Sequence, residues 1–251
     1  MATTNKKMKG EKTVAKAQYK ICLDPGHGGR DPGAIGNGLK EKDITLAISL
    51  KVAELLKQNG QEVILTRVTD RFIGQTPERT PNANISVSIH VNAGGGQGLE
   101  TWVSLFNKAG ESQKLGKSIQ ENILKQILFK NRGLKTRKNS AGNQDYLYMI
   151  RKPVGVPVLI EVGFIDNPTD ANILKDKANL DKIAKGIASG ILQYLGKELM
   201  EVEATKILYA GRKLDGFIVD GRTYVEVRKL CEAIGLKVHY DAKTKLVEVK
   251  R

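Results

Sequence analysis

Short apolar runs alternate with longer segments of helical periodicity along much of the chain. Residues 19–23 and 62–67 have the length and apolar content of short strands. Between them, residues 42–59 predict a core-packing helix, and Gly60 supplies its C-terminal stop. The apolar residues at helical spacing in this segment are Ile44, Ile48, Val52, Leu55 and Leu56. Such a strand-helix-strand unit predicts two parallel strands joined by a right-handed crossover.

The same alternation continues to residue 196. Residues 85–91, 98–106 and 156–164 are predicted to form further strands. Two more helices are predicted from apolar residues three or four apart, namely Leu115, Ile119, Ile123 and Ile127 in one, and Ile183, Ile187, Ile191 and Tyr194 in the other. The sequence therefore predicts one α/β domain over residues 19–196.

Polar segments interrupt this pattern in two places. Residues 68–84 contain Pro77 and Pro81 and predict a loop with a short helix. Residues 129–152 are rich in Lys and Arg, so we expect an exposed loop at one edge of the sheet. A loop of this composition could hold an anionic substrate.

The two ends of the chain differ from the α/β domain. An acidic connector at residues 197–205 leads into residues 206–251, which predict two strands, one helix and two strands, a small α+β domain of the form ββαββ. Residues 1–18 are rich in lysine and have no periodic apolar face, which predicts a mostly disordered basic tail.

Composition narrows the class of protein. The formal charge of +14 over 251 residues suggests a polyanionic partner, either nucleic acid or the anionic polymers and stem peptides of a cell wall, although a lysine-rich surface also serves solubility. Neither a membrane-spanning run nor the apolar core of a signal peptide is seen, so we expect no membrane partner and synthesis in the cytoplasm. Cys22 and Cys231 form no disulfide or metal-binding pattern and are expected to be buried thiols.

The candidate chemistry begins in residues 21–41, ICLDPGHGGRDPGAIGNGLKE. His27 follows the carboxyl end of the first strand, where ligands gather in open α/β sheets. Glu41 begins the next helix, and a loop folded back on itself could aim both side chains at one metal ion. The alternatives are a phosphate-cradling loop and a turn with a surface histidine. GHGG lacks the Lys-Ser/Thr of a P-loop and the G-x-G-x-x-G order of a dinucleotide site.

Further candidates lie at the ends of later strands. His90 repeats the placement of His27, which makes it the third candidate ligand, or else a hydrogen-bonded core histidine. Glu161 is the single acid in an apolar strand and must be either salt-bridged or functional. Asn92 could orient a ligand or substrate, or simply form a turn, and Arg79 could form a buried salt bridge or meet a substrate carboxylate.

Several of these motifs occur together in one known family. LDPGHGG, the Glu41-Lys42-Asp43 triplet, LTR, SIHVNA, G-x-E and EVGFIDNP resemble the amidase-3 family of zinc-dependent N-acetylmuramoyl-L-alanine amidases, over residues 19–196. The resemblance implies one Zn²⁺ per chain held by His27, Glu41 and His90, with Glu161 as catalytic acid/base. It also implies an open, mostly parallel sheet of about six strands flanked by helices.

Residues 206–251 resemble a second family, the small stalk module akin to the amino-terminal domain of copper amine oxidases, without implying copper. This module is expected to bind the cell wall or to pair two copies into a homodimer, because so small a sheet buries little core alone.

The function expected from these features is hydrolysis of the amide between N-acetylmuramic acid and L-alanine in peptidoglycan. A phage endolysin that reaches the wall after release, through a holin pore or cell lysis, is the favoured setting, and a bacterial autolysin is the alternative. Another zinc amidohydrolase of peptidoglycan, either carboxypeptidase or deacetylase, and a non-catalytic wall-binding protein remain alternatives. No nucleic-acid partner is expected, because no recognised binding motif or aromatic platform is present.

Overall fold

The computed structural model describes residues 19–200, 203–209, 211–219, 222–241, 244 and 246–250. The predicted tail at residues 1–18 lies outside these residues. No helix among the described residues is long and apolar enough to cross a membrane.

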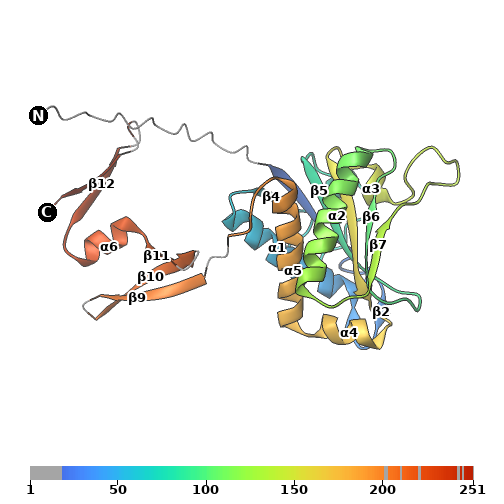
Figure 1. The fold of residues 1–251 in the computed structure, drawn as a ribbon, viewed down its shortest axis with the longest axis horizontal. Helices are drawn as coiled ribbons and strands as arrows, with labels where there is room; N and C mark the ends of the chain where they lie inside the picture. The colour runs from blue at the N-terminus through green and yellow to red at the C-terminus, as the bar shows by residue number, and fades with distance from the viewer. Residues whose placement is uncertain are drawn as a thin grey trace, which may run out of the picture.

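A six-stranded sheet forms the centre of the first domain, in the order β4-β1-β5-β8-β6-β7 (Figure 1). Its strands are β1 (Lys20–Pro25), β4 (Glu62–Leu65), β5 (Ile85–Asn92), β6 (Leu99–Val103), β7 (Asn131–Lys135) and β8 (Val156–Phe164). All neighbouring strands are parallel except β6 and β8, which are antiparallel. The predicted open, mostly parallel α/β sheet is therefore confirmed.

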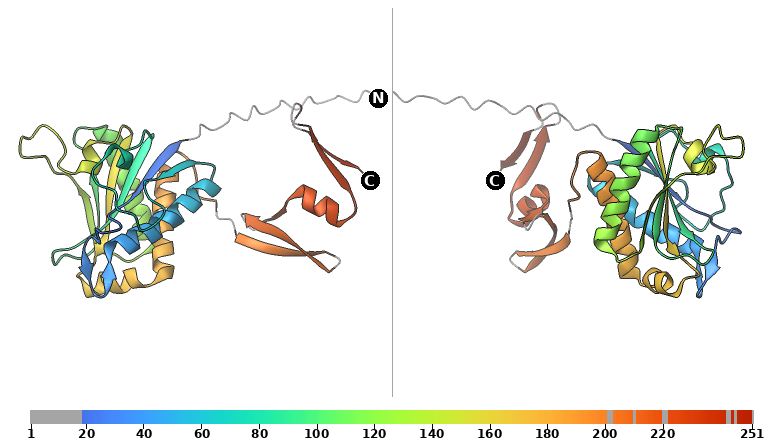
Figure 2. Two further views of the ribbon diagram at one scale, coloured as in Figure 1. Left: turned by 180° about the vertical axis from the view of Figure 1, so that it is seen from behind. Right: turned by 45° about the vertical axis from the view of Figure 1, so that its right-hand side comes forward.

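Three long helices cover one face of this sheet, and α2 and α5 lie side by side in every view (Figures 1 and 2). They are α1 (Glu41–Gln58), α2 (Ala109–Gln126) and α5 (Lys177–Tyr194). Alternate strand residues, such as Val87 and Ile89 in β5 and Val158 and Ile160 in β8, join them in the main core. Burial of these aliphatic side chains supplies the main driving force for folding.

The other sheet face carries the chemistry. Side chains alternate along a strand, so Ser88, His90, Leu159 and Glu161 project away from the three long helices. Leu159 packs there with Met149 and Ile150 of the short helix α3 (Tyr148–Arg151) and the segment around it. The polar positions within these strands therefore share a face that α3 covers only in part.

The structure corrects the prediction for residues 129–152. These residues contain edge strand β7 and helix α3, with an exposed loop only between them. An edge strand pairs on one side and needs no strong apolar alternation. The Lys- and Arg-rich sequence of β7 therefore did not predict a strand.

Small elements complete the first domain. A two-residue ladder pairs β2 (Ile35–Gly36) with β3 (Leu39–Lys40) just before α1. The 3₁₀-helix η1 (Pro77–Arg79) provides the short helix expected near Pro77. Helix α4 (Pro168–Lys175) precedes α5 and is capped by Asn167, whose side chain accepts from two backbone amides.

The C-terminal part is a separate β-rich unit, as predicted, but with one strand more before its helix. It contains β9 (Glu203–Tyr209), β10 (Arg212–Val219), β11 (Arg222–Val225), α6 (Val227–Ala233), β12 (Lys237–Asp241) and β13 (Leu246–Lys250). Regular structure thus begins within the segment 197–205. The sequence Asp220-Gly221, a hairpin signal, separates β10 from β11, which pair antiparallel. The predicted ββαββ order is therefore βββαββ over the described residues.

Candidate metal centre

His27 lies two residues after the end of β1 in a left-handed conformation, with φ of 62°. Its Nδ1 is 2.8 Å from Asp31 Oδ2, and its Nε2 is 3.1 Å from Glu41 Oε2. A carboxylate on one ring nitrogen fixes the imidazole orientation and leaves the other nitrogen free to bind a metal. Asp31 was not among the predicted site residues, although its position four residues after His27 was visible in the sequence.

Glu41 is the first residue of α1 and is 3% exposed. Its Oε2 accepts from Ala34 N at 2.8 Å, and its Oε1 accepts from Val91 N at 2.9 Å. Oε1 is also 2.9 Å from His90 Nδ1. The carboxylate is therefore fixed between the two histidines by backbone amides from two separate segments.

Two glycines make this close approach possible. A Cβ atom on Gly26 would lie 2.5 Å from His90 Cε1, and one on Gly33 would lie 2.5 Å from Glu41 Oε2. Gly33 also has a φ of 66°, a backbone conformation that residues with a side chain rarely adopt. The LDPGHGG and DPG segments thus need glycine for space as well as for conformation.

The structure brings His27, Glu41 and His90 together as the sequence predicted. One ligand atom from each residue lies within 4.8 Å of the others. The two imidazole rings meet edge to face, with centroids 5.0 Å apart. Two imidazoles and one carboxylate are a donor set that Zn²⁺ uses in catalytic sites, with a further position left for water or substrate. The residues therefore fit a zinc ion, and their role as ligands stays a prediction.

The charges of this cluster are strongly coupled. Burial favours the neutral forms, but the hydrogen bonds of Glu41 with His27 and His90 outweigh it and hold the pKa of Glu41 far below its usual range. Burial likewise opposes protonation of His27, yet its bonds to Glu41 and Asp31 raise the pKa of His27 to about 9. Glu41 is thus a carboxylate at neutral pH, and a bound metal ion has to displace the proton on His27.

Glu161 lies beside His90 on the neighbouring strand β8 and opposite Glu100 on β6. Its Oε2 is buried and has no hydrogen-bond partner among the described residues. Burial raises the pKa of Glu161 to about 7, and the nearby carboxylates Glu41 and Glu100 add to the rise while His90 opposes it. A carboxyl group with a pKa near neutrality can both accept and return a proton.

The side chains of Asn92 and Arg79, the two predicted substrate contacts, both donate hydrogen bonds to carboxylates of the protein itself. Asn92 Nδ2 donates to Glu100 Oε1 at 3.0 Å, and Arg79 Nε donates to Asp24 Oδ1 at 2.9 Å. Asp24 is fully buried and also accepts from Thr66 and Ser88. Arg79 thus has the buried salt bridge that was one of its two expected roles, and Nη2 remains buried without a partner among the described residues.

A cavity of about 320 Å³ opens over the cluster. His27, Asp31, Arg79 and His90 contribute its polar lining, and Phe72, Leu147, Tyr148 and Leu159 are among its apolar lining. A cleft with apolar walls and a few convergent polar groups is typical of a ligand-binding site.

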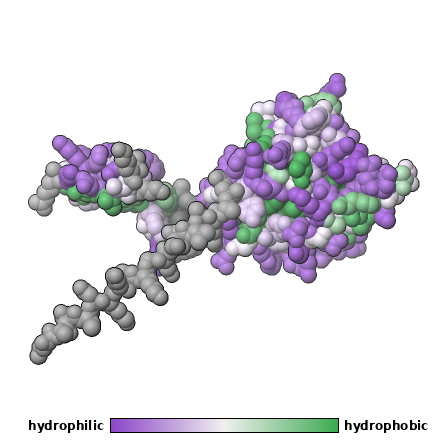
Figure 3. Space-filling model, turned by 90° about the horizontal axis from the view of Figure 1, so that it is seen from above, coloured by the Kyte–Doolittle hydropathy of each residue, from purple (hydrophilic) through white to green (hydrophobic). Residues whose placement is uncertain are grey.

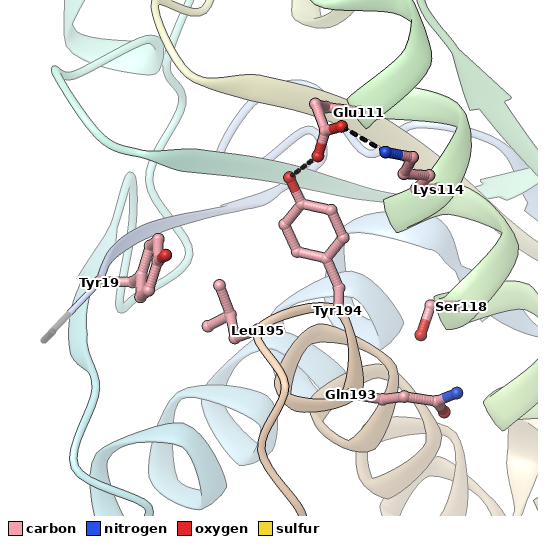
Figure 4. A pocket seen from close by; sticks show the side chains of 7 residues that line it. All are labelled: Tyr19, Glu111, Lys114, Ser118, Gln193, Tyr194 and Leu195. Carbon is pink, nitrogen blue, oxygen red and sulfur yellow. Dashed lines mark hydrogen bonds and ion pairs between the residues drawn. The ribbon is translucent and has the colours of Figure 1, made fainter. Parts of the chain in front are cut away.

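A second hollow, of about 500 Å³, lies at Tyr19 and Tyr194 and shares no lining residue with the cleft (Figure 4). Tyr194 donates to Glu111 Oε2 at 2.8 Å, and Lys114 donates to the other carboxylate oxygen. These polar groups satisfy one another, so the cleft at His27 is the stronger candidate site.

A largely parallel α/β sheet with a His-Glu-His cluster and a buried glutamate at its strand ends is typical of metal-assisted hydrolases. Residues 21–193 match the family model described as N-acetylmuramoyl-L-alanine amidase, and residues 209–251 match the copper amine oxidase N-terminal domain. The chain belongs to the N-acetylmuramoyl-L-alanine amidase family, which confirms the family of the first resemblance, while zinc dependence stays a prediction. The second match supports the expected C-terminal stalk-like module.

Relatives and solved structures agree with this assignment. The sporulation-specific N-acetylmuramoyl-L-alanine amidase of Bacillus subtilis (strain 168) is 36% identical over 69% of this chain and 67% of that protein. The endolysin of Bacillus phage SPP1 is 38% identical over 70% of this chain and 65% of that protein. The N-acetylmuramoyl-L-alanine amidase AmiC2 of Nostoc punctiforme has a TM-score of 0.63 at 33% identity, covering 72% of this chain and 99% of that chain. The chain thus spans about two thirds of each of the two relatives.

Proposed function

We propose that this chain hydrolyses the amide between N-acetylmuramic acid and L-alanine in peptidoglycan, with Zn²⁺ held by His27, Glu41 and His90. The observation that carries the proposal is the position of Glu161 beside this cluster. Its buried Oε2 has no hydrogen-bond partner among the described residues, as expected for a group whose partner in the reaction is substrate or water. Family membership supports the choice of bond.

Zn²⁺ bound here would supply a Lewis acid that polarises the amide carbonyl and acidifies water. The chain's own residues would do the rest. Asp31 holds His27 in one orientation, and the amides of Ala34 and Val91 hold Glu41. Glu161 would accept a proton from the attacking water and return it to the departing amine of L-alanine.

Two other zinc amidohydrolase activities on peptidoglycan, carboxypeptidase and deacetylase, would use the same groups. The family match and the relatives favour the amidase, because they are described as N-acetylmuramoyl-L-alanine amidases. A non-catalytic wall-binding protein would not need a buried glutamate with a pKa near 7 beside a candidate metal site.

We also propose that the enzyme acts as a phage endolysin, released from the cytoplasm to reach the wall. The similarity to the endolysin of Bacillus phage SPP1 supports this setting. The bacterial autolysin remains the second candidate, because the sporulation-specific amidase of Bacillus subtilis is of comparable similarity.

Digestion of purified cell walls tests the bond. The full chain loaded with zinc should release new L-alanine amino groups. New reducing sugars, free carboxyl-terminal residues or released acetate should stay at the level of a sample without enzyme. Release of acetate or of a carboxyl-terminal amino acid instead would assign the protein to deacetylases or carboxypeptidases.

A further inference from the structure

A further hollow, distinct from the one at Tyr19 and Tyr194, adjoins the catalytic cleft on the side of the loop between β7 and α3. It measures about 590 Å³ and has three cationic side chains in its lining, Arg137, Lys138 and Arg151. We call it the basic hollow. No acidic side chain is among its lining residues.

These cations have no carboxylate partner among the described residues. Arg151 donates to the backbone oxygens of Asp145 and Tyr146, so it holds the loop in place. Arg137 is exposed and lies over the ring of Tyr146, with Cζ 3.9 Å from the centroid, and Lys138 is also exposed. Tyr146 therefore supports the guanidinium from one side and leaves its N–H donors unused.

The sequence around the hollow offers no neutralising charge. Residues 129–152 contain seven Lys or Arg residues and one acid, Asp145. Asp145 is 2% exposed, and its carboxylate accepts from the Ser104 hydroxyl and the Leu105 amide. Because this one acid is used inside the protein, the cations around the hollow repel one another until an anion enters.

The basic hollow adjoins the cleft over the metal cluster. Gln75, Leu147 and Tyr148 line both. A substrate held at His27 and His90 can therefore extend across these three residues into the basic hollow. Each peptide residue adds about 3.3–3.6 Å in an extended chain, so a peptide of a few residues suffices to cross between adjoining hollows of this size.

We propose that the basic hollow is a binding subsite for the carboxylates of the peptide part of the substrate, with Arg137 and Lys138 as its specificity-determining residues. The inference rests on the proposed function, because the peptide follows the scissile amide. The glycan side of that amide is a neutral sugar, whereas stem peptides carry free carboxylates. Arg and Lys recognise carboxylates through charge-assisted hydrogen bonds.

Two muramyl peptides of equal length test the subsite, one with free side-chain and terminal carboxylates and one with carboxamides in their place. The full chain with zinc should cleave the carboxylate substrate with a kcat/KM about tenfold higher, a ratio expected from one or two charge-assisted contacts. In the variant Arg137→Gln/Lys138→Gln this preference should fall to about one. The loss should appear as a higher KM with kcat retained, because the contacts bind ground state and transition state alike.

Matched variants separate recognition from loss of charge or fold. Lys175→Gln/Lys182→Gln removes the same charge from exposed positions on α4 and α5 and should keep the preference. The variant Arg137→Lys/Lys138→Arg keeps the positive charge and should retain most of the preference for the carboxylate substrate. An unchanged preference in Arg137→Gln/Lys138→Gln, or an equal loss on both substrates, would overturn the subsite.

The remaining arms distinguish other causes. Failure of the unmodified chain to cleave either peptide would refute the proposed function, whereas cleavage of both at equal rates refutes only the subsite. Calorimetry with poly(glycerol phosphate) should show no binding that depends on Arg137 and Lys138. Binding that the double variant loses while keeping its carboxylate preference would assign the hollow to a phosphate polymer and overturn the proposal.

Discussion

Glu161 occupies a place where a carboxylate is costly, because it lies in a buried strand with an unpartnered oxygen. In the metal-free protein its pKa is about 7 against an ordinary value of 4.5, so the folded state holds a proton that the unfolded state has lost between these values. Stability should therefore fall as pH rises from about 4.5 to about 7, by roughly 3 kcal/mol for a shift of this size.

Replacement of Glu161 by Gln should remove this decline, since an amide does not ionise. The metal-free variant should be more stable than the parent above pH 7, and the difference should shrink as the pH approaches 4.5. Urea unfolding at a series of pH values measures both curves. Parallel curves for the two proteins would mean that Glu161 ionises normally.

The same substitution should abolish most of the activity. A positioned acid/base contributes roughly 10²- to 10⁴-fold, so kcat should fall by at least this factor in Glu161→Gln. Zinc content should stay near one ion per chain, and wall binding should change little. Glu121→Gln on the exposed face of α2 is a matched control and should keep full turnover. If Glu161→Gln lost zinc, Glu161 would itself be a ligand.

Metal removal tests the histidines directly. Chelation should abolish activity and added zinc should restore it, because His27, Glu41 and His90 supply the ligand atoms. His90→Ala should lower zinc content measured by atomic emission. His239→Ala removes the third histidine of the chain, which lies in β12, and should leave zinc content unchanged. Full activity in a metal-free preparation would exclude zinc catalysis.

At the scale of elements, apolar periodicity was a good guide where a segment is buried. The predicted strand at residues 156–164 has the bounds of β8, and the strand-helix-strand unit of β1, α1 and β4 is present with parallel strands. The pattern failed at β7, where only one neighbour and few apolar contacts are needed. Periodicity reports apolar content and burial, so it detected the edge strand β4, whose sequence EVIL is mostly apolar, and missed the edge strand β7, whose sequence NRGLK has one large apolar residue, Leu134.

The site was predictable only in part, for a related reason. Strand ends and residue types indicated His27 and His90 as candidate ligands. The close approach of the Glu41 carboxylate to these two histidines, however, depends on the fold of residues 28–40. Asp31 and Asp24 act through contacts with His27, Arg79, Thr66 and Ser88 that are distant in sequence or set by loop conformation. Hydrogen bonds of this kind leave no periodic trace in the sequence.

The bond between Arg79 and Asp24 joins η1 to the end of β1, and it should matter for stability. Asp24 is fully buried. Removal of Arg79 would leave the Asp24 carboxylate with the hydroxyls of Thr66 and Ser88 as its only side-chain donors among the described residues. Arg79→Ala should lower the free energy of unfolding by about 3–5 kcal/mol, as for other broken buried pairs. Arg71→Ala, which breaks the exposed pair with Glu78, should cost less than about 1 kcal/mol. Chemical denaturation measures the free energy of unfolding of both variants. Equal losses of stability would contradict a stabilising role for the buried Arg79–Asp24 pair.

At the scale of the whole molecule, the two domains differ in how well they bury their apolar residues. The first has an extensive core, whereas Cys231 is the one apolar side chain buried among the described residues after 204. Several large apolar side chains of the C-terminal module are exposed, and one side of it is coloured hydrophobic in Figure 3. They include Leu208, Phe217, Tyr224, Tyr240, Val247 and Val249. Small folds with so little core need a partner for stability.

The last prediction follows from this difference. A chain that ends at Met200 keeps the packing of Leu199 and the hydrogen bonds between Met200 and Asn59. It should stay folded, bind zinc and cleave small muramyl peptides, because the cleft residues all precede it. Sedimentation velocity should show a dimer for the full chain and a monomer for the shortened one, since a second copy would cover the exposed apolar side chains. A full chain that is monomeric but binds purified walls better than the shortened one would assign the module to wall binding. Equal wall binding by two monomeric proteins would exclude both roles.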